Sequence, residues 1–284
     1  MMQIRMLPDG RLHLQHGPID CLLRAWGTAV EVEAAYRQAA AAFPGILPAL
    51  CTELPALRTE LPSREPSGSV ARAMHRAASP FAAGFITPMA AVAGAVADHL
   101  LFALVKGRTL DRAFVNNGGD IAFHLAPGQS LRCGLVSDLT EPALDGAFLL
   151  RSDHPARGLA TSGRACKGRG GRSFSLGIAD SVSVLARTAA EADAAATVIA
   201  NAVDLPGHDG IHRVPACDID PDSDLGVRLV TWDVGHLTRA EIVASLDAGA
   251  DVADDLTKAG LILGAVLCLR GQMVVRATHA MELA

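Results

Sequence analysis

The sequence predicts an α+β fold. Segments with strand character cluster at the two ends and in the middle of the chain, and helical segments lie between these clusters. The last cluster, "GAVLCLRGQMVVRATH" (264–279), has two apolar runs around Arg270-Gly271 that indicate a hairpin. Strict alternation of single strands with helices would instead indicate a doubly wound parallel sheet, and it is not seen.

The N-terminal third predicts strands followed by helices. Residues 1–30 have strand character, with "RLHLQHG" alternating and "DCLLRAWG" following a Gly-Pro turn. A helix is expected over 30–43, ended by Pro44-Gly45, and a shorter one over 69–79. The four Pro and Gly residues between 55 and 69 predict a loop that separates the two helices.

Capping signals locate the later helices. Thr87 followed by Pro88 predicts a helix start, and the apolar run that follows, 89–105, contains Asp98 and His99. Thr188 with Glu191 and Thr238 with Glu241 have the spacing of capping boxes, which predicts helices beginning near both threonines. Strands are expected around "NNGGD" in 113–126 and at 180–186, while 157–179 is rich in Gly and Arg.

Composition limits the functional class. Half of the residues are hydrophobic, 19% are charged and the net charge is −5, which argues against a protein that coats nucleic acid or an anionic membrane. The run 89–105 is slightly short for a membrane span and carries a charge, so we expect a buried helix. With so few charges, a homo-oligomer, most simply a dimer, is expected.

The N-terminus and the cysteines favour a cytoplasmic protein. The segment "MMQIRMLPDGRLHLQHGP" contains no apolar core of the kind that a signal peptide has. The six cysteines are far apart and none forms a CxxC pair, so we expect free thiols in a reducing compartment.

Two glycine-rich segments are candidates for ligand binding. In "NNGGD", Asn116, Asn117, Gly118 and Gly119 allow close backbone approach to an anion, and Asp120 could hold a ribose hydroxyl or a metal; alternatively, Asn-Gly marks a plain hairpin turn. In "GLATSGRACKGRGGRSFSLG" and at Arg157 just before it, five arginines and lysines that include Arg172 suit a phosphate or another anion. The alternative for this second segment is a solvated surface loop.

Acidic residues give two further candidates. The run "DIDPDSDLG" (218–226) is similar to a calcium loop but lacks its register of Gly and Glu, so a solvated loop is favoured. In the alanine-rich helix 191–203, Asp193, Thr197 and Asn201 are four residues apart and share one face. Asp and Thr oxygens one turn apart suit Mg²⁺, whereas Asp193 could also stabilise the N-terminal end of its own helix.

Several motifs together resemble one known family. "NNGGDIA", "GLATSG", "DSVSVLARTAAEADAAAT" and "NAVDLP" occur in the order found in the ApbE-like superfamily, whose best-known members are FAD:protein FMN transferases. "TPMAAVAGAVAD" and "ADAAATVIANAVDLP" look more closely like an uncharacterised prokaryotic branch of it. The resemblance implies one ApbE-like domain over 1–284 with a mostly antiparallel sheet and packed helices. Its motif core lies at 88–203, followed by a helix and hairpin at 238–279.

The resemblance also implies site residues. The transferases bind Mg²⁺ through an Asp-x-x-x-Thr helix, which corresponds here to Asp193 and Thr197. Their nucleotide-site segments correspond to the GGD of 118–120 and to Ala160, Thr161, Ser162 and Gly163. Their Lys-Gly-Tyr-Ala-x-Asp stretch corresponds to 93–98, where the Gly, the second Ala and Asp98 are retained. FAD or FMN would then be the ligand, with Mg²⁺ beside it.

Other positions depart from the transferase pattern. Ala93 and Ala95 replace the Lys and Tyr of that stretch, and "SFSLGIAD" replaces a His-x-x-x-Pro-x-x-Gly segment. Three functions therefore stay open: an Mg²⁺-dependent enzyme acting on FAD or another nucleotide or phosphorylated ligand, a non-catalytic protein that binds a flavin or small anionic ligand, and a structural subunit of an enzyme complex. No general base is identified by the sequence.

Overall fold

The computed structural model describes residues 2–135, 146–163, 174–277 and 282–283. Contacts between Cα atoms divide the chain into two compact units. Unit 1 comprises Met1–Cys133, Phe148–Ala160 and Leu185–Ala194, and unit 2 comprises Gly134–Ala147, Thr161–Val184 and Ala195–Ala284. Five elements cross between the units, namely β6 (Ser130–Leu135), β7 (Gly146–Arg151), β8 (Gly158–Ser162), β9 (Ser181–Ala186) and α6 (Ala189–Ala202).

Unit 1 contains an antiparallel sheet in which the strand order is β1-β2-β3-β4-β5-β8. Every pair along this order is antiparallel. The first five strands are β1 (Met2–Met6), β2 (Leu12–His16), β3 (Ile19–Gly27), β4 (Leu110–Asn117) and β5 (Asp120–Leu125). On β3 the residues alternate between buried and partly exposed, because one face packs on helices and the other does not.

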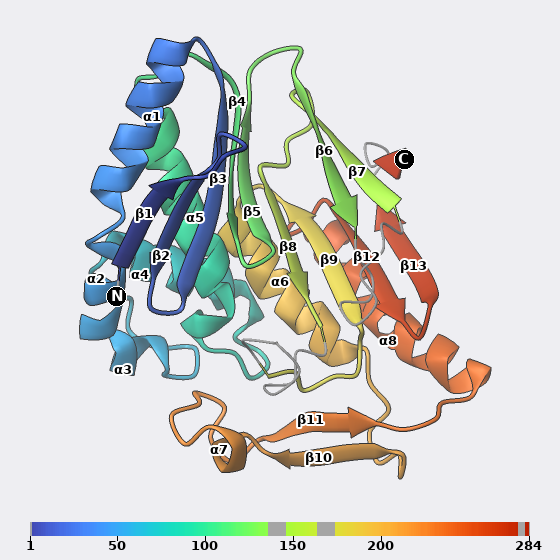
Figure 1. The fold of residues 1–284 in the computed structure, drawn as a ribbon. Helices are drawn as coiled ribbons and strands as arrows, with labels where there is room; N and C mark the ends of the chain where they lie inside the picture. The colour runs from blue at the N-terminus through green and yellow to red at the C-terminus, as the bar shows by residue number, and fades with distance from the viewer. Residues whose placement is uncertain (1, 136–145, 164–173, 278–281, 284) are drawn as a thin grey trace. The chain divides into compact units, whose positions relative to one another are not determined.

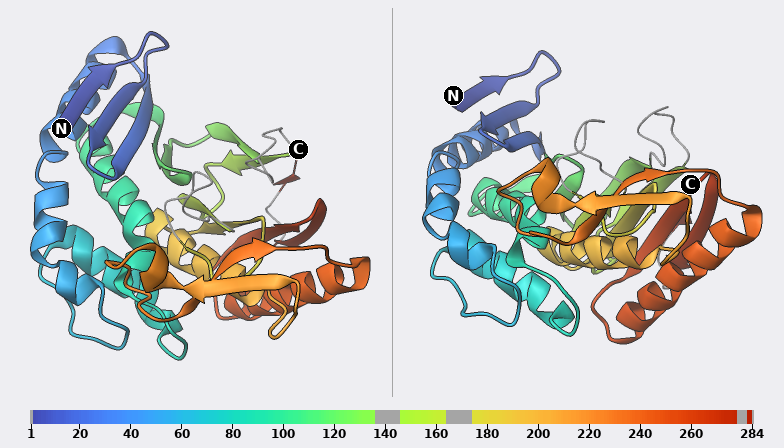
Figure 2. Two further views of the ribbon diagram at one scale, coloured as in Figure 1. Left: turned by 60° about the horizontal axis from the view of Figure 1, so that its bottom comes forward. Right: turned by 90° about the horizontal axis from the view of Figure 1, so that it is seen from below.

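The helices of unit 1 cover one face of this sheet. Helix α5 passes behind β3 and β4 in Figure 1, and α1 and α5 lie side by side in Figure 2. The core between helices and sheet is built mainly from Ala, Leu and Val side chains. These helices are α1 (Ala29–Ala42), α2 (Ile46–Thr52), α3 (Leu54–Leu57), α4 (Ser69–Ala78), the 3-10 turns η1 (Ser79–Phe81) and η2 (Pro88–Ala91), and α5 (Val92–Val105).

Helix α5 has the composition of a membrane span and the contacts of a core helix. Residues Pro88–Val105 have a mean hydropathy of 1.7, and by length alone they could cross a membrane. In unit 1, α5 contacts α1, α4, β4 and β5, and Ala95, Val96, Leu100 and Leu104 are almost completely buried. The expectation of a buried helix is therefore met inside unit 1.

Unit 2 contains a hairpin, a helix that packs on it and a separate ribbon. The hairpin pairs β12 (Gly264–Leu269) with β13 (Gln272–Ala277), and α8 (Arg239–Lys258) contacts both strands. The ribbon pairs β10 (Ile211–Pro215) with β11 (Leu229–Val234), and the short helix α7 (Ala216–Ile219) lies between them in sequence. A three-stranded sheet has the order β14-β7-β6, where β14 is Glu282–Leu283.

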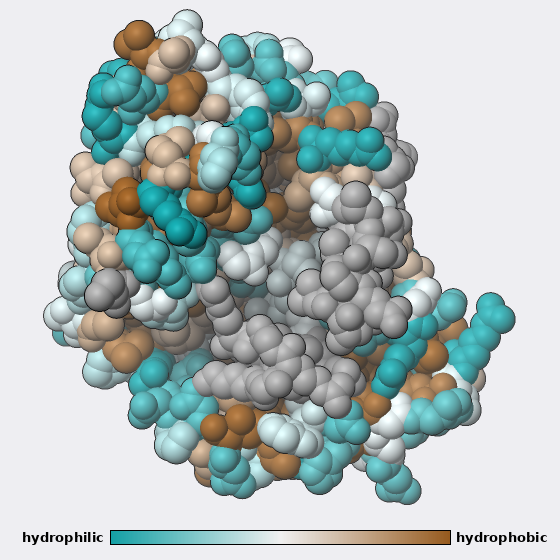
Figure 3. All heavy atoms as spheres, viewed as in Figure 1, coloured by the Kyte–Doolittle hydropathy of each residue, from teal (hydrophilic) through white to brown (hydrophobic). Residues whose placement is uncertain are grey.

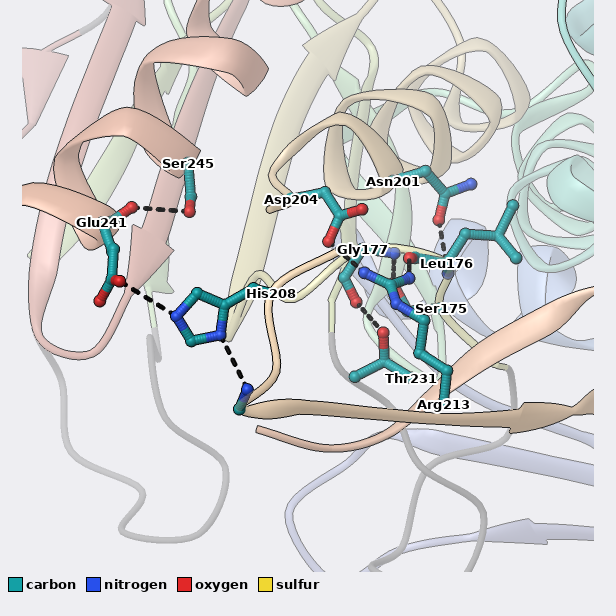
Figure 4. A network of polar contacts seen from close by, with 11 residues as sticks. Ser175, Leu176, Gly177, Asn201, Asp204, His208, Arg213, Thr231, Glu241 and Ser245 are labelled. Atoms are coloured by element: carbon teal, nitrogen blue, oxygen red, sulfur yellow. Dashed lines mark hydrogen bonds and ion pairs between the residues drawn. The ribbon is translucent and has the colours of Figure 1, made fainter. Parts of the chain in front are cut away.

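A polar network in unit 2 joins the ribbon to the segment before β9 (Figure 4). Arg213 of β10 donates to the carbonyl of Leu176 and pairs with Asp204. Thr231 of β11 donates its hydroxyl to the Gly177 carbonyl at 2.8 Å. In the same network, His208 Nε2 lies 3.0 Å from Glu241 Oε1, while hydrogen bonds from Thr238 and His208 hold the pKa of Glu241 at about 2.

Most of the predicted local elements are confirmed. The Thr87 hydroxyl accepts from Met89 N–H, the Thr188 hydroxyl accepts from Glu191 N–H, and both halves of the Thr238–Glu241 capping box form. Arg270 and Gly271 have positive φ angles of 50° and 73°, as a tight hairpin turn between β12 and β13 requires. The expected α+β fold with a mostly antiparallel sheet is correct.

Some expectations need correction. The loop predicted over 55–69 begins later, because Leu54–Leu57 forms α3. The ATSG segment, expected in a glycine-rich loop, instead lies mostly within strand β8. The ribbon β10–β11 was not predicted, because its strands are short.

Candidate functional site

The predicted residues of unit 1 meet where α5, α6 and the β4–β5 turn come together. Gly118 and Gly119, with φ angles of 70° and 113°, form the two-residue turn between β4 and β5. The hairpin interpretation of "NNGGD" is therefore correct as geometry. It brings Asp120 close enough to Asp193 of α6 for the two carboxylates to repel each other.

Two carboxylates hold α5 and α6 together by capping each other's helix. Asp98 of α5 accepts from the backbone N–H groups of Ala189 at 3.0 Å and Ala190 at 2.9 Å, the first two residues of α6. In return, Asp193 of α6 accepts from the N–H of Gly94, near the start of α5, at 3.0 Å. Each carboxylate thus satisfies unpaired donors at the positive end of the neighbouring helix.

Close contact between these helices depends on glycine. A Cβ atom placed on Gly94 would lie 2.2 Å from the Ala189 carbonyl oxygen, and one on Gly158 would lie 2.1 Å from the Thr188 carbonyl oxygen. Real Cβ atoms do not approach backbone oxygens this closely. The two glycines therefore allow α5 and β8 to contact the start of α6, which places Asp193 and Asp98 for their hydrogen bonds.

The surroundings of Asp193 disfavour a negative charge on its carboxyl group. Burial by surrounding protein atoms raises its pKa well above the usual value, and the negative charges of Asp120 and Asp98 raise it further. Hydrogen bonds from the Gly94 and Ala93 amides partly offset this. The residue nevertheless keeps some solvent access. A proton on Asp193 or a bound cation would relieve the repulsion between Asp193 and Asp120.

The pKa of Asp98 gives a testable pH dependence. Burial raises it to about 6, against the lowering effect of the Ala190 and Ala189 amides. A folded-state pKa above the unfolded one adds stability below pH 4, and this contribution is lost as pH rises through 6. We expect the unfolding free energy of wild type to fall relative to Asp98→Asn by up to about 2 kcal/mol between pH 4 and 7. Urea unfolding of both proteins at pH 4 and pH 7 measures this change. If the difference in unfolding free energy between the two proteins is the same at both pH values, the prediction is wrong.

Each asparagine of the turn has a partner inside unit 1. Asn116 Oδ1 accepts from Gly119 N–H at 2.9 Å, which stabilises the turn. Asn117 is buried, donates to the Ala93 carbonyl at 3.1 Å and accepts from Asp20 N–H at 3.4 Å. Their predicted role in ligand binding stays a prediction, and both side chains already support the structure.

The predicted residues of unit 2 have structural contacts of their own. Thr161 Oγ1 lies 2.8 Å from Ser183 Oγ, and a Cβ on Gly163 would lie 2.4 Å from the Asp180 carbonyl oxygen. Ser162 is partly exposed at the end of β8. Arg172 lies outside the described residues, as does most of the arginine-rich segment.

The three polar residues on one face of α6, Asp193, Thr197 and Asn201, have different contacts. Asn201 accepts from Leu176 N–H at 3.0 Å (Figure 4), so its amide serves the fold of unit 2. Thr197 is partly exposed, and its hydroxyl makes no hydrogen bond to another residue that the structure describes. Asp193 stabilises the start of α5 and not the start of its own helix, where the Thr188 hydroxyl accepts from Glu191 N–H at 3.1 Å.

The acidic residues that the structure describes form no complete metal site of their own. Across the described ranges, no group of three or more His, Cys, Asp and Glu side chains is placed to bind an ion, and this includes the acidic run 218–226. A cation at Asp193 would therefore have at most two carboxylate ligands, with the remaining oxygens from Thr197, water or a bound phosphate. That donor set fits Mg²⁺, which keeps several waters and ligand phosphates, better than Zn²⁺.

The sequence also predicted free thiols. Cys21, Cys51, Cys133, Cys217 and Cys268 form no disulfide with one another, and Cys166 lies outside the described residues. Cys21 and Cys268 are buried among apolar side chains and contribute to packing.

Comparison with known proteins agrees with the fold and motifs. The chain is an α+β protein of the ApbE-like class. It belongs to the AbpE bacteria family, whose sequence model matches residues 4–275. The family resemblance seen in the motifs is therefore confirmed.

Curated relatives are UPF0280 proteins of methanogenic archaea. The one from Methanospirillum hungatei is 32% identical over 166 residues, which cover 58% of this chain and 65% of the relative. The one from Methanothermobacter thermautotrophicus is 38% identical over 137 residues, which cover 48% of this chain and 49% of the relative. The matches thus span between about half and two thirds of these relatives.

Two solved structures are similar at low scores. The apbe protein of Thermotoga maritima has a TM-score of 0.38 at 14% identity, covering 89% of this chain and 77% of that chain. The flavinyl transferase ApbE of Pseudomonas stutzeri, in its apo form, has a TM-score of 0.37 at 16% identity, covering 91% and 75%.

Proposed function

We propose that the protein binds a flavin nucleotide, or a related phosphorylated ligand, together with Mg²⁺ at Asp193. The observation that carries this proposal is the position of Asp193 inside unit 1: the Gly94 N–H holds its carboxylate at 3.0 Å, and the negative charge of nearby Asp120 raises its pKa. A divalent cation would remove the repulsion, and Thr197, one turn along α6, offers a neutral oxygen. Family membership makes a flavin nucleotide the first ligand to test.

The residues have distinct parts in this proposal. Mg²⁺, when bound, would polarise phosphate oxygens and orient the ligand. Asp193 would carry the charge that retains the cation, while its hydrogen bond with Gly94 fixes the carboxylate in place. Asn116 and the two glycines hold the turn that positions Asp120. Whether FMN transfer or pyrophosphate cleavage follows is part of the test, because the described residues suggest no general base.

A second candidate is a non-catalytic flavin- or nucleotide-binding protein. It is favoured by Ala93 and Ala95, which stand where the transferases have Lys and Tyr. Ala95 is almost completely buried inside unit 1, so that position contributes packing and cannot contribute a polar group. Self-association and a cytoplasmic location remain predictions of the sequence.

Calorimetric titration of the metal-stripped protein with Mg²⁺ tests the proposal, in the absence and presence of FAD or ATP. We expect saturable heat that is larger when FAD is present. At a ligand concentration one hundred times Kd, binding should raise the free energy of unfolding by about 2.7 kcal/mol, which a thermal shift detects. Chromatography of the same mixtures for FMN separates the enzyme from the binding protein. No heat and no thermal shift with any combination would reject the metal-dependent site.

A further inference from the structure

The sheet of unit 1 carries a second cluster of chemistry on the face away from its helices. On β3, Cys21, Leu23 and Ala25 are buried against the helices, so Arg24 and Trp26 point to the opposite face. In the register with β4, Trp26 pairs with Arg112 and Arg24 pairs with Phe114. Figure 3 shows hydrophilic and hydrophobic residues side by side over these N-terminal strands.

Two arginines contact one indole ring in this cluster. The guanidinium carbon of Arg112 lies 4.6 Å from the centre of the Trp26 ring, and that of Arg24 lies 4.9 Å from it. Phe114 packs against the same ring, with 5.9 Å between the ring centres. All four side chains are partly exposed. One indole ring thus contacts two cations at a surface that solvent reaches.

The positive charge of this cluster is not neutralised within the described part of the chain. Arg112 donates to the Ser130 carbonyl at 3.1 Å, but neither Arg112 nor Arg24 forms an ion pair with a described carboxylate. Asp9, the acidic group whose pKa Arg24 helps to lower, is paired with Arg11 at 2.7 Å. Asp9 is thus shared by Arg11 and Arg24, while Arg112 has no described carboxylate as a partner.

We propose that Arg24 and Arg112 form a binding subsite for a phosphoryl group. Two guanidinium groups around one ring repel each other, and a phosphate dianion between them would remove that repulsion and accept several of their N–H groups. Trp26 and Phe114 hold the arginines in place and provide an apolar wall. Carboxylates are weaker candidates, because a single negative charge leaves one arginine uncompensated.

This subsite is separate from the proposed site at Asp193. Arg112 and Asn117 are five positions apart on β4, which places the arginine about 17 Å along the strand from the end that carries the "NNGGD" turn. The inference therefore does not rest on the proposed function. Either site can be removed by mutation without altering the other.

Tryptophan fluorescence provides a direct test. The chain has two tryptophans, so Trp232→Phe leaves Trp26 as the only reporter. We expect a saturable change in its emission on titration with inorganic phosphate, pyrophosphate or ATP at constant ionic strength. Arg24→Gln and Arg112→Gln should each weaken binding about tenfold or more. Arg37→Gln is the matched control, because it removes an arginine from an exposed pair with Glu33 on α1.

The outcomes separate the possible ligands. Equal affinity for pyrophosphate and ATP would assign the subsite to the phosphoryl group alone, whereas tighter binding of ATP would extend it to a nucleotide. The same emission change with chloride, or unchanged affinity in Arg24→Gln, would overturn the proposal and leave a structural cation–π cluster. Arg24→Gln tests the proposal even if Arg112→Gln folds poorly. Arg24 makes no hydrogen bond with another described residue, so its replacement breaks none.

Discussion

Replacing Gly94 by alanine is expected to destabilise the protein by about 3–5 kcal/mol, a large part of the stability of an ordinary domain. The added Cβ would lie 2.2 Å from the Ala189 carbonyl oxygen and 2.7 Å from the Ala190 nitrogen, both rigid backbone atoms. Helix α5 would have to move away from the start of α6. That movement would also break the hydrogen bonds of Asp98 and Asp193, which cross between these two helices.

Gly45→Ala is the control for this substitution. Gly45 has a φ of −80°, and nothing lies within 4 Å of a Cβ atom built on it. Gly45 is the N-cap of α2, so its replacement should lower the unfolding free energy by no more than about 1 kcal/mol. Urea unfolding monitored by circular dichroism compares the two variants. If the unfolding free energy of Gly94→Ala lies within about 1 kcal/mol of the wild-type value, α5 and α6 separate easily. The close contact would then not be the reason for a glycine at position 94.

Local signals in the sequence were sufficient for the caps and the hairpin. Thr238 and Glu241 are three residues apart, and Arg270 and Gly271 are adjacent, so each motif contains all the atoms that decide its geometry. The ribbon β10–β11 is different. Its strands are separated by α7 and a turn-rich segment, and their pairing is decided by contacts such as that of Thr231 with Gly177.

The candidate site shows where prediction from residues stops. The face of α6 that carries Asp193 follows from helical periodicity, but its partner Gly94 is 99 residues earlier in the chain. One of the two interpretations of Asp193, that it stabilises the N-terminal end of its own helix, is therefore wrong, because it caps the neighbouring helix. Asp98 was expected at the site through family resemblance alone, and its hydrogen bonds to Ala189 and Ala190 depend on packing that no short motif encodes.

The arginine–tryptophan cluster was missed for a related reason. Arg24 and Trp26 are two residues apart, so alternation along a strand places them on one face. Nothing in either segment alone reveals that Arg112 lies opposite Trp26, because the register of β3 with β4 depends on the whole sheet. The one signal in the sequence was that Arg24 and Trp26, a basic and an aromatic residue, share the more exposed face of β3.

Substitutions on α6 and the β4–β5 turn are expected to have a large effect on the affinity for Mg²⁺. Asp193→Asn should weaken Mg²⁺ binding by about 10- to 100-fold, because it removes the charge that retains the cation and keeps the side-chain volume. Thr197→Val should weaken it by less than about tenfold, since a neutral ligand is lost. Asp251→Asn, at an exposed position of α8, removes an acidic charge elsewhere and is the control.

Asp120→Asn separates a cation site from a purely structural carboxylate. Without metal, it removes the negative charge that raises the pKa of Asp193, so the stripped protein should become more stable near pH 7. With Mg²⁺ present, the same substitution should weaken cation binding. If Asp193 only holds the Gly94 amide, Mg²⁺ would stabilise none of these proteins, and Asp193→Asn would cause a similar loss with and without metal. Thermal unfolding of each variant with Mg²⁺ or EDTA distinguishes the two cases, because only a bound cation reverses the sign of the Asp120→Asn effect.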